Sequence, residues 1–170
     1  MTKPFVAVLM GSDSDLPVMQ LTFQVLDKLK VPWEAKITSA HRTAKATHDY
    51  VKDAEQRGCA IFIAAAGLAA HLAGFVAGLT IKPVIGVPMD GGPLNGQDAL
   101  LSTVQMPGGI PVASMAIGKA GAKNAGYLAA QILAVSDQGI DKRIRAEREE
   151  NAEQIRRKDA KLQLELNKEE

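Results

Sequence analysis

Short apolar runs alternate with amphipathic segments along most of this chain. Five runs have the length and composition of strands, at residues 5–10, 33–38, 60–66, 83–88 and 111–117. A continuous apolar run such as FVAVLM at residues 5–10 is typical of a strand buried on both faces of a parallel sheet. The pattern therefore predicts a sheet with helices packed on both of its faces.

Helical periodicity separates these runs. The first helix is predicted by apolar residues near helical spacing, namely Leu16, Met19, Phe23, Leu26 and Leu29. Further helices are expected over residues 43–58, 69–80, 98–105 and 120–135. Because strands and helices alternate, we expect right-handed parallel crossovers. The fold class is then α/β, a flavodoxin-like three-layer sandwich with a five-stranded parallel sheet and a C-terminal helical extension.

The C-terminal segment has a different composition. Residues 141–170 contain nine Lys and Arg and nine Asp and Glu, so 18 of 30 residues are charged without net charge. The sparse apolar positions there are Ile144, Ile155, Leu162, Leu164 and Leu166. We expect one flavodoxin-like domain over residues 1–135 and a charged helical extension over residues 136–170, frayed at its end and lying against a neighbouring subunit.

Composition excludes several classes of protein. The chain has 170 residues, 46% of them apolar and 23% charged, which is typical of a soluble globular domain. A net charge of +1 favours neither nucleic acid nor membrane as a partner. The first apolar run is too short for a signal peptide, and no run reaches the roughly 20 residues of a membrane span. The single cysteine, Cys59, fits a reducing cytoplasm and is expected to be buried in a strand.

Ligands of such folds bind beyond the carboxyl ends of the strands. Those loops are residues 11–15, 39–43, 66–72 and 89–97. The first loop, GSDSD, offers Gly11, Ser12, Ser14 and Asp15, whose amides and hydroxyls suit an anion and whose carboxylate suits a ribose diol. In the alternative interpretation, Ser14 or Asp15 only caps the following helix.

The second loop, ITSAHRTA, places a proton-exchanging group beside an anion-binding group. His41 can donate or accept a proton near neutral pH, and the Arg42 guanidinium matches phosphate oxygens. In the alternative interpretation, Ser39 and Thr43 cap a helix and the two residues between them are solvated. His48 is expected on a helix and outside the site, and the spacing of the three histidines does not favour a metal site.

The third loop, within AAAGLAAHLAG, is made almost entirely of small residues apart from His71. Its backbone amides can approach a flat anionic ligand closely. The same composition is also expected of a tightly packed helix start, and spacing alone does not decide between the two.

Taken together, the ordered segments resemble the bacterial class I PurE family of carboxyaminoimidazole ribonucleotide mutases. The resemblance covers roughly residues 6–134 and rests on MGSDSD, SAHRTA, AAHLAG, VIGVP, STVQMPGGIPV and AIGKAGAKNAGYLAAQIL. It implies an enzyme of de novo purine synthesis that moves a carboxylate from the exocyclic nitrogen to the adjacent ring carbon of an aminoimidazole ribonucleotide. It also implies no ATP, metal or organic cofactor, a small-molecule ribonucleotide as substrate, a cytoplasmic location and a homo-octamer.

The resemblance assigns roles to particular residues. His41 matches the catalytic histidine, Ser12 and Asp15 match substrate-binding residues, and Arg42 matches the arginine expected near the phosphate. The remaining expected substrate-binding positions are Gly11, Ser14, Ser39, Ala40, Ala66, Gly67, Leu68, His71 and Leu72. This chain departs from the family at Ala65, Leu68 and Ala73, where glycine, glycine and proline are more usual.

Two alternatives remain open. A class II enzyme would carboxylate aminoimidazole ribonucleotide with free carbon dioxide, but its relatives tend to have lysine after the histidine, where this chain has Arg42. A non-catalytic nucleotide-binding module would use GSDSD and Arg42 but would leave His41 without a task. A flavin-binding electron carrier is disfavoured, because the predicted ligand loops are almost free of aromatic residues.

Overall fold

A computed structural model describes residues 3–167 of the chain. Five parallel strands form one sheet in the order β2-β1-β3-β4-β5. Their bounds are β1 Phe5–Met10, β2 Trp33–Ile37, β3 Cys59–Ala66, β4 Val84–Pro88 and β5 Ala113–Ser114. The chain adds β2 on one side of β1 and β3, β4 and β5 on the other. The carboxyl ends of β1 and its neighbours therefore form the switch point of a flavodoxin-like fold.

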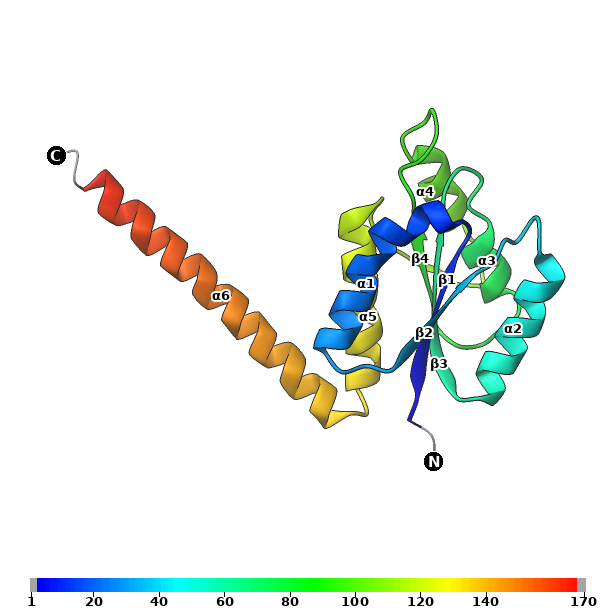
Figure 1. Cartoon of the computed structure of the whole chain (residues 1–170), viewed down its shortest axis with the longest axis horizontal. Coiled ribbons are helices and arrows are strands. Elements are labelled where there is room, and N and C mark those ends of the chain that lie inside the picture. Colours follow the sequence, from blue (N-terminus) through cyan, green and yellow to red (C-terminus); the bar gives the residue numbers. More distant parts are fainter. Residues whose placement is uncertain (1–2, 168–170) are drawn as a thin grey trace.

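Helices cover both faces of the sheet (Figure 1). Their bounds are α1 Leu16–Lys28, α2 Ala44–Gln56, α3 Leu72–Ala77, α4 Gln97–Val104, α5 Lys119–Ala134 and α6 Gln138–Leu166, with a short 3-10 helix at Asp13–Asp15 before α1. Residues alternate between two buried clusters along β1: Val6 and Val8 pack toward α1 and α5, while Ala7 and Leu9 pack toward α2 and α3. The expected three-layer α/β sandwich is confirmed.

Two predicted elements are shorter than expected. The strand expected over residues 111–117 pairs with β4 only at Ala113 and Ser114. Pro111 has no N–H to donate to a neighbouring strand. Beyond Ser114, the hydrogen bonds from Met115 N to Gly86 O and from Gly118 N to Pro88 O do not extend the strand pairing. The helix expected over residues 69–80 occupies only Leu72–Ala77, because residues 67–71 instead form a loop over the sheet edge.

Cys59 is buried at the start of β3, as expected for a strand cysteine. Its thiol donates to the carbonyl of Ile61 at 3.2 Å. Burial raises the pKa of the Cys59 thiol to about 11, so the thiol stays protonated at neutral pH and is a poor nucleophile.

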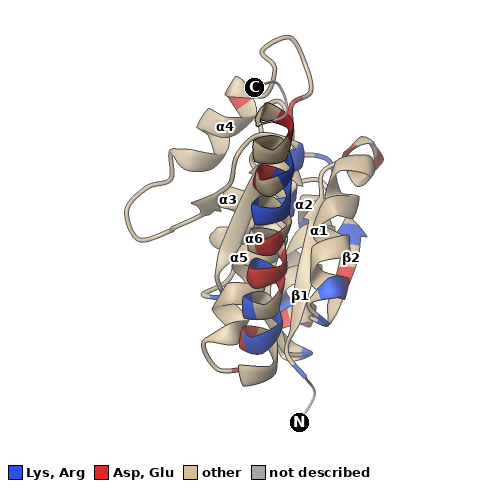
Figure 2. Ribbon diagram, turned by 90° about the vertical axis from the view of Figure 1, so that its left-hand side faces the viewer, with Lys and Arg blue, Asp and Glu red and all other residues tan. Residues whose placement is uncertain are grey.

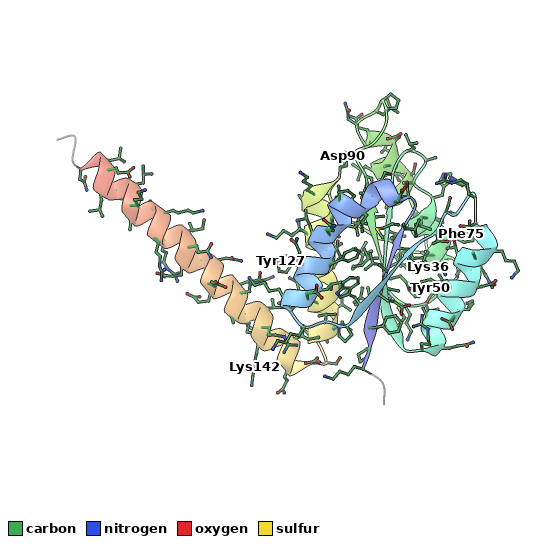
Figure 3. The ribbon with its side chains drawn as sticks, viewed as in Figure 1. Lys36, Tyr50, Phe75, Asp90, Tyr127 and Lys142 are labelled. Carbon is green, nitrogen blue, oxygen red and sulfur yellow. The ribbon has the colours of Figure 1, made fainter. Side chains whose placement is uncertain are left out.

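The far end of the sheet from the ligand loops is held by a polar cluster on Glu34 of β2. Arg57 donates two hydrogen bonds to its carboxylate, at 2.6 and 2.8 Å, and the Tyr50 hydroxyl donates a third at 2.7 Å. Beside it, the Lys36 ammonium lies 4.9 Å from the centre of the Tyr50 ring (Figure 3). The Arg57 pair holds the pKa of Glu34 below its ordinary value, although partial burial acts in the opposite direction.

Helix α6 begins against the body of the domain and then projects away from it (Figure 1). The Asp137 carboxylate caps its start by accepting from Gly139 N and Ile140 N, at 2.8 and 3.1 Å. Ile140 and Ile144 are buried in the cluster beneath α1 and α5. The later apolar positions of the segment, Ile155, Leu162, Leu164 and Leu166, are exposed.

Glu147 joins the first turns of α6 to α1 and α5. Its carboxylate accepts a hydrogen bond from the Tyr127 hydroxyl of α5 at 2.6 Å and pairs with Lys28 Nζ of α1 at 2.9 Å. Burial acts to raise the pKa of Glu147, but these two donors outweigh it and hold the pKa below its ordinary value. Further along, both signs of charge are distributed over the helix (Figure 2), which is consistent with the sequence composition. No helix within residues 3–167 is long and apolar enough to cross a membrane.

Candidate functional site

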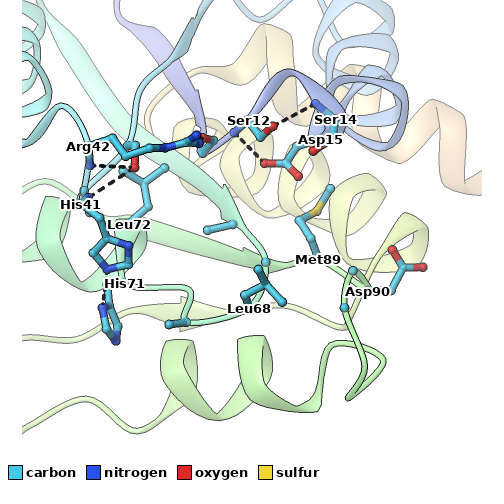
Figure 4. A pocket seen from close by; sticks show the side chains of 18 of the residues that line it. Ser12, Ser14, Asp15, His41, Arg42, Leu68, His71, Leu72, Met89 and Asp90 are labelled. Atoms are coloured by element: carbon cyan, nitrogen blue, oxygen red, sulfur yellow. Dashed lines mark hydrogen bonds between the residues drawn. The ribbon is translucent and has the colours of Figure 1, made fainter.

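The loops that follow β1, β2, β3 and β4 meet around a cavity of about 650 Å³ at the carboxyl edge of the sheet (Figure 4). Every site residue expected from the sequence lines this cavity: Gly11, Ser12, Ser14, Asp15, Ser39, Ala40, His41, Arg42, Ala66, Gly67, Leu68, His71 and Leu72. Parallel strands place their following loops at one edge, so four segments far apart in sequence converge there.

In the first loop, Ser12 and Asp15 form a capping box at the start of the 3-10 helix Asp13–Asp15. The Ser12 Oγ accepts from Ser14 N at 3.3 Å, and Ser12 N donates to Asp15 Oδ2 at 3.1 Å. Asp15 occupies the position before α1, but its side chain makes no hydrogen bond to that helix and turns back to Ser12 instead. Asp15 is therefore the N-cap of α1 by position, as one interpretation expected, but its side chain does not cap that helix, and the Ser12 hydroxyl caps the preceding 3-10 helix Asp13–Asp15.

Asp15 is buried on the cavity wall, with 7% of its surface exposed. Burial raises its pKa, and the backbone N–H groups of Ser12 and Gly11 only partly offset this effect. The carboxylate therefore lacks part of the hydrogen bonding that an ionised acid needs in a buried place. A ligand hydroxyl that donates to it would supply the missing stabilisation.

Asp13 was missed by the sequence analysis. Its Oδ1 accepts from the Ser12 hydroxyl at 3.0 Å and from Ser14 N at 3.1 Å. These two donors belong to the loop that the sequence assigns to an anion. In this structure the exposed carboxylate of Asp13 occupies them, so an incoming phosphate would have to displace it.

The second loop is held by a serine turn. The Ser39 Oγ accepts from the backbone N–H groups of His41 at 3.3 Å and Arg42 at 3.2 Å. Thr43 makes no side-chain bond to α2, and its hydroxyl instead accepts from Ser39 N at 2.9 Å. Thr43 is thus the N-cap of α2 by position, as the capping interpretation expects, while the turn brings His41 and Arg42 to the cavity wall, where an active-site role stays a prediction.

His41 of the second loop and His71 of the third loop form a hydrogen-bonded pair on the cavity wall. His41 Nε2 lies 2.7 Å from His71 Nδ1, with the rings edge to face at 89°. A hydrogen bond at this distance requires that one of the two nitrogens carries a proton and the other does not. The pair can therefore hold a proton beside the cavity and fixes the orientation of both rings. His48 lies outside this group, exposed on α2 and 3.2 Å from Asp49.

Arg42 connects the second loop with the first. Its guanidinium donates to the carbonyl of Gly11 at 3.3 Å, which places the positive charge beside Ser12 and Ser14. A guanidinium with remaining free N–H groups next to two hydroxyls is suited to bind a phosphate.

The third and fourth loops form the remaining wall. Leu68 adopts a φ of 56°, a left-handed conformation that costs a residue with a Cβ about 1 to 2 kcal/mol. Six further residues line the cavity that were not among the expected site residues: Val18, Ala69, Met89, Asp90, Gly91 and Gly92. The signal for most of them was present, because residues 89–97 had been recognised as a loop at the same edge of the sheet.

The donor groups around the cavity do not resemble a metal site. Within residues 3–167, no three His, Cys, Asp or Glu side chains gather closely enough to bind a metal ion together. The polar groups of the cavity are hydroxyls, backbone amides, a guanidinium, a histidine pair and the two separate carboxylates of Asp15 and Asp90.

Fold and site define a class of protein first: a flavodoxin-like α/β domain with a cavity at its switch point, lined by hydroxyls, a guanidinium and a hydrogen-bonded histidine pair. Comparison with known proteins then identifies the family. The family model described as AIR carboxylase matches residues 5–154. The chain therefore belongs to the AIR carboxylase family.

Individual relatives agree with this assignment. The chain is 51% identical over 152 residues to the N5-carboxyaminoimidazole ribonucleotide mutase of Bacillus subtilis, covering 89% of this chain and 93% of that protein. It is 47% identical over 160 residues to the mutase of the same name from Thermotoga maritima, covering 94% of this chain and 92% of that protein. The crystal structure of Treponema denticola PurE superimposes with a TM-score of 0.85 at 32% identity, covering 94% of this chain and 99% of that chain.

Proposed function

We propose that this chain is an ATP-independent N5-carboxyaminoimidazole ribonucleotide mutase of de novo purine biosynthesis. Its substrate carries a carboxylate on the exocyclic nitrogen, and its product carries that carboxylate on the adjacent ring carbon. Relatives with this name are about half identical over nearly the whole chain. The observation that carries the proposal is the position of His41, paired with His71 at the cavity and next to Arg42.

The cavity offers a separate place for each part of such a substrate. Arg42, with the hydroxyls of Ser12 and Ser14, is suited to the phosphate, and Asp15 is suited to the ribose hydroxyls. The base and its carboxylate then lie toward the histidine pair. The other substrate-binding positions we propose are Gly11, Ser39, Ala40, Ala66, Gly67, Leu68, His71 and Leu72.

One histidine suffices for the two proton transfers of the reaction. Protonated His41 donates its proton to the exocyclic nitrogen, the nitrogen–carbon bond breaks, and carbon dioxide and the free amine result. The electron-rich ring carbon attacks carbon dioxide and forms the new carbon–carbon bond. Neutral His41 then removes the proton from that tetrahedral carbon and restores the aromatic ring, so the enzyme ends in its initial protonation state.

Label transfer tests the reaction. Substrate labelled at its carboxylate carbon is converted in excess unlabelled bicarbonate without ATP. Mass spectrometry then measures the fraction of product that carries the label in its ring carboxylate. Label retained in the ring carboxylate supports direct transfer. Label replaced by unlabelled carbon would instead indicate the class II carboxylase, and ligand binding without product would indicate the binding module.

Substitution of His41 tests its role. His41→Asn should abolish turnover while product still binds, because the fold and Arg42 are unchanged. His48→Asn is the matched control, since His48 is exposed on α2 outside the cavity. Turnover of His41→Asn within a few-fold of the unsubstituted enzyme would contradict the role of His41.

We also propose that the enzyme is cytoplasmic and a homo-octamer, with residues 1–135 as the catalytic domain and 136–170 as its extension. The single buried cysteine supports a reducing compartment. Large exposed apolar side chains support subunit contacts around α4 and its neighbouring loops: Ile81, Leu101, Val104 and Ile110. Light scattering after size-exclusion chromatography measures the assembly, and a monomeric mass would contradict it.

A further inference from the structure

Leu68 holds an unfavourable backbone conformation at the cavity. Its φ of 56° lies in the left-handed region, where a Cβ is crowded. Among residues 3–167, the other residues with positive φ that are not glycine are Lys30 and Asn95. Asn tolerates this region well, whereas a leucine there persists only when its surroundings favour it. The surroundings of Leu68 should therefore explain why the side chain is kept.

The side chain of Leu68 reaches from the third loop to the fourth. A Cβ placed on Gly92 would overlap the Leu68 Cδ2 methyl, so that methyl fills the space left by the glycine. The bases of the same loops are joined by a hydrogen bond from Met89 N to the carbonyl of Ala66 at 2.9 Å. Leu68 and Gly92 thus form a second connection between the two loops, nearer their tips, with Leu68 drawn between His71 and Met89 (Figure 4).

Beside this contact, three of the residues that line the wall between the loops are glycines. Gly67, Gly91 and Gly92 line the cavity there and contribute no side chains. Leu68 is 54% exposed, so it covers the rim with its inner side against Gly92 and its outer side in solvent. A strained leucine at the rim of a cavity is difficult to explain by core packing.

We propose that Leu68 closes the cavity rim between the third and fourth loops and limits the escape of the carbon dioxide released during the reaction. The inference rests on the proposed mutase function. Carbon dioxide is small, neutral and without hydrogen-bond donors, so polar groups hold it weakly and enclosure by apolar surface retains it. Leu68 supplies that surface at the place where glycines leave a gap.

Three variants separate the side chain from the strain. Leu68→Gly removes both, because glycine adopts positive φ freely. Leu68→Ala keeps the Cβ and its strain but removes the methyl groups that contact Gly92. Lys30→Gly relieves comparable strain, at a φ of 54°, in the turn between α1 and β2 and away from the cavity lining. It is the matched control.

The measurement is the partition of released carbon dioxide. Each enzyme converts carboxylate-labelled substrate in excess unlabelled bicarbonate, and we measure labelled product, unlabelled product and free aminoimidazole ribonucleotide. Both Leu68 variants should lower the ratio of labelled product to the sum of the other two by about fivefold, which corresponds to about 1 kcal/mol in the barrier to escape. Lys30→Gly should leave the ratio unchanged.

The outcomes are distinct. A ratio in both Leu68 variants equal to that of the unsubstituted enzyme overturns the inference while the mutase function stands. An equal loss in Lys30→Gly also overturns it, because the effect would then arise from backbone flexibility elsewhere. If the unsubstituted enzyme forms no labelled product, the proposed function fails and the inference fails with it.

Discussion

The hydrogen bond between His41 and His71 is the most direct link between the geometry of the site and its rate. Replacing His71 with leucine removes the partner of His41 Nε2 and leaves an imidazole free to rotate. The bond is 2.7 Å long and accessible to water. A net hydrogen bond contributes about 0.5 to 1.5 kcal/mol, and exposure favours the middle of that range, so we take about 1 kcal/mol.

That free energy corresponds to about a fivefold decrease in rate. We expect His71→Leu to lower kcat and kcat/KM together, because an oriented His41 matters in the proton transfers and less in binding the ribonucleotide. His71→Asn is the informative comparison, since its amide places a polar atom near the former Nδ1. It should recover most of the loss.

Initial rates of product formation across substrate concentrations separate kcat from KM. The reasoning is refuted if His71→Leu retains kcat within twofold of the unsubstituted enzyme. It is equally refuted if His71→Asn is as slow as His71→Leu, because the hydrogen bond would then be irrelevant. A change confined to KM would show that His71 binds substrate without orienting His41.

Two further predictions concern the charged groups around the fold. Asp13→Asn should tighten binding of the product ribonucleotide about two- to fivefold by calorimetry, and less at high salt, because it removes a negative charge from the Ser12 and Ser14 donors. Equal affinity at low salt would contradict this. Glu34 has a pKa held below its ordinary value by Arg57 and Tyr50, so its contribution to stability is present above its unfolded pKa and is lost as pH falls through the folded one. The urea midpoints of the unsubstituted enzyme and Glu34→Gln should therefore differ at pH 7 and converge in acid; a difference independent of pH would show that the carboxylate charge is not its source.

Much of the fold and the position of the site could be predicted from the sequence. Apolar runs of strand length and helices of 3.6-residue period are local patterns, so the first four strands and most helices were predicted within a few residues. The order of these elements then placed four loops at one edge of the sheet, where the cavity lies. The 111–117 strand and the 69–80 helix were overestimated, because apolar composition does not reveal where backbone partners end.

Contacts between loops depended on the tertiary structure. His41 and His71 are 30 residues apart, and only the register of β1, β2 and β3 brings their rings within hydrogen-bonding distance. Leu68 meets Gly92 through the pairing of β3 with β4, and Glu147 meets Tyr127 through the packing of α6 against α5. The sequence by itself determined which residue types stand at the carboxyl ends of the strands. Which of them touch was decided by the packing of the sheet, because distances between loops follow from strand pairing and not from spacing along the chain.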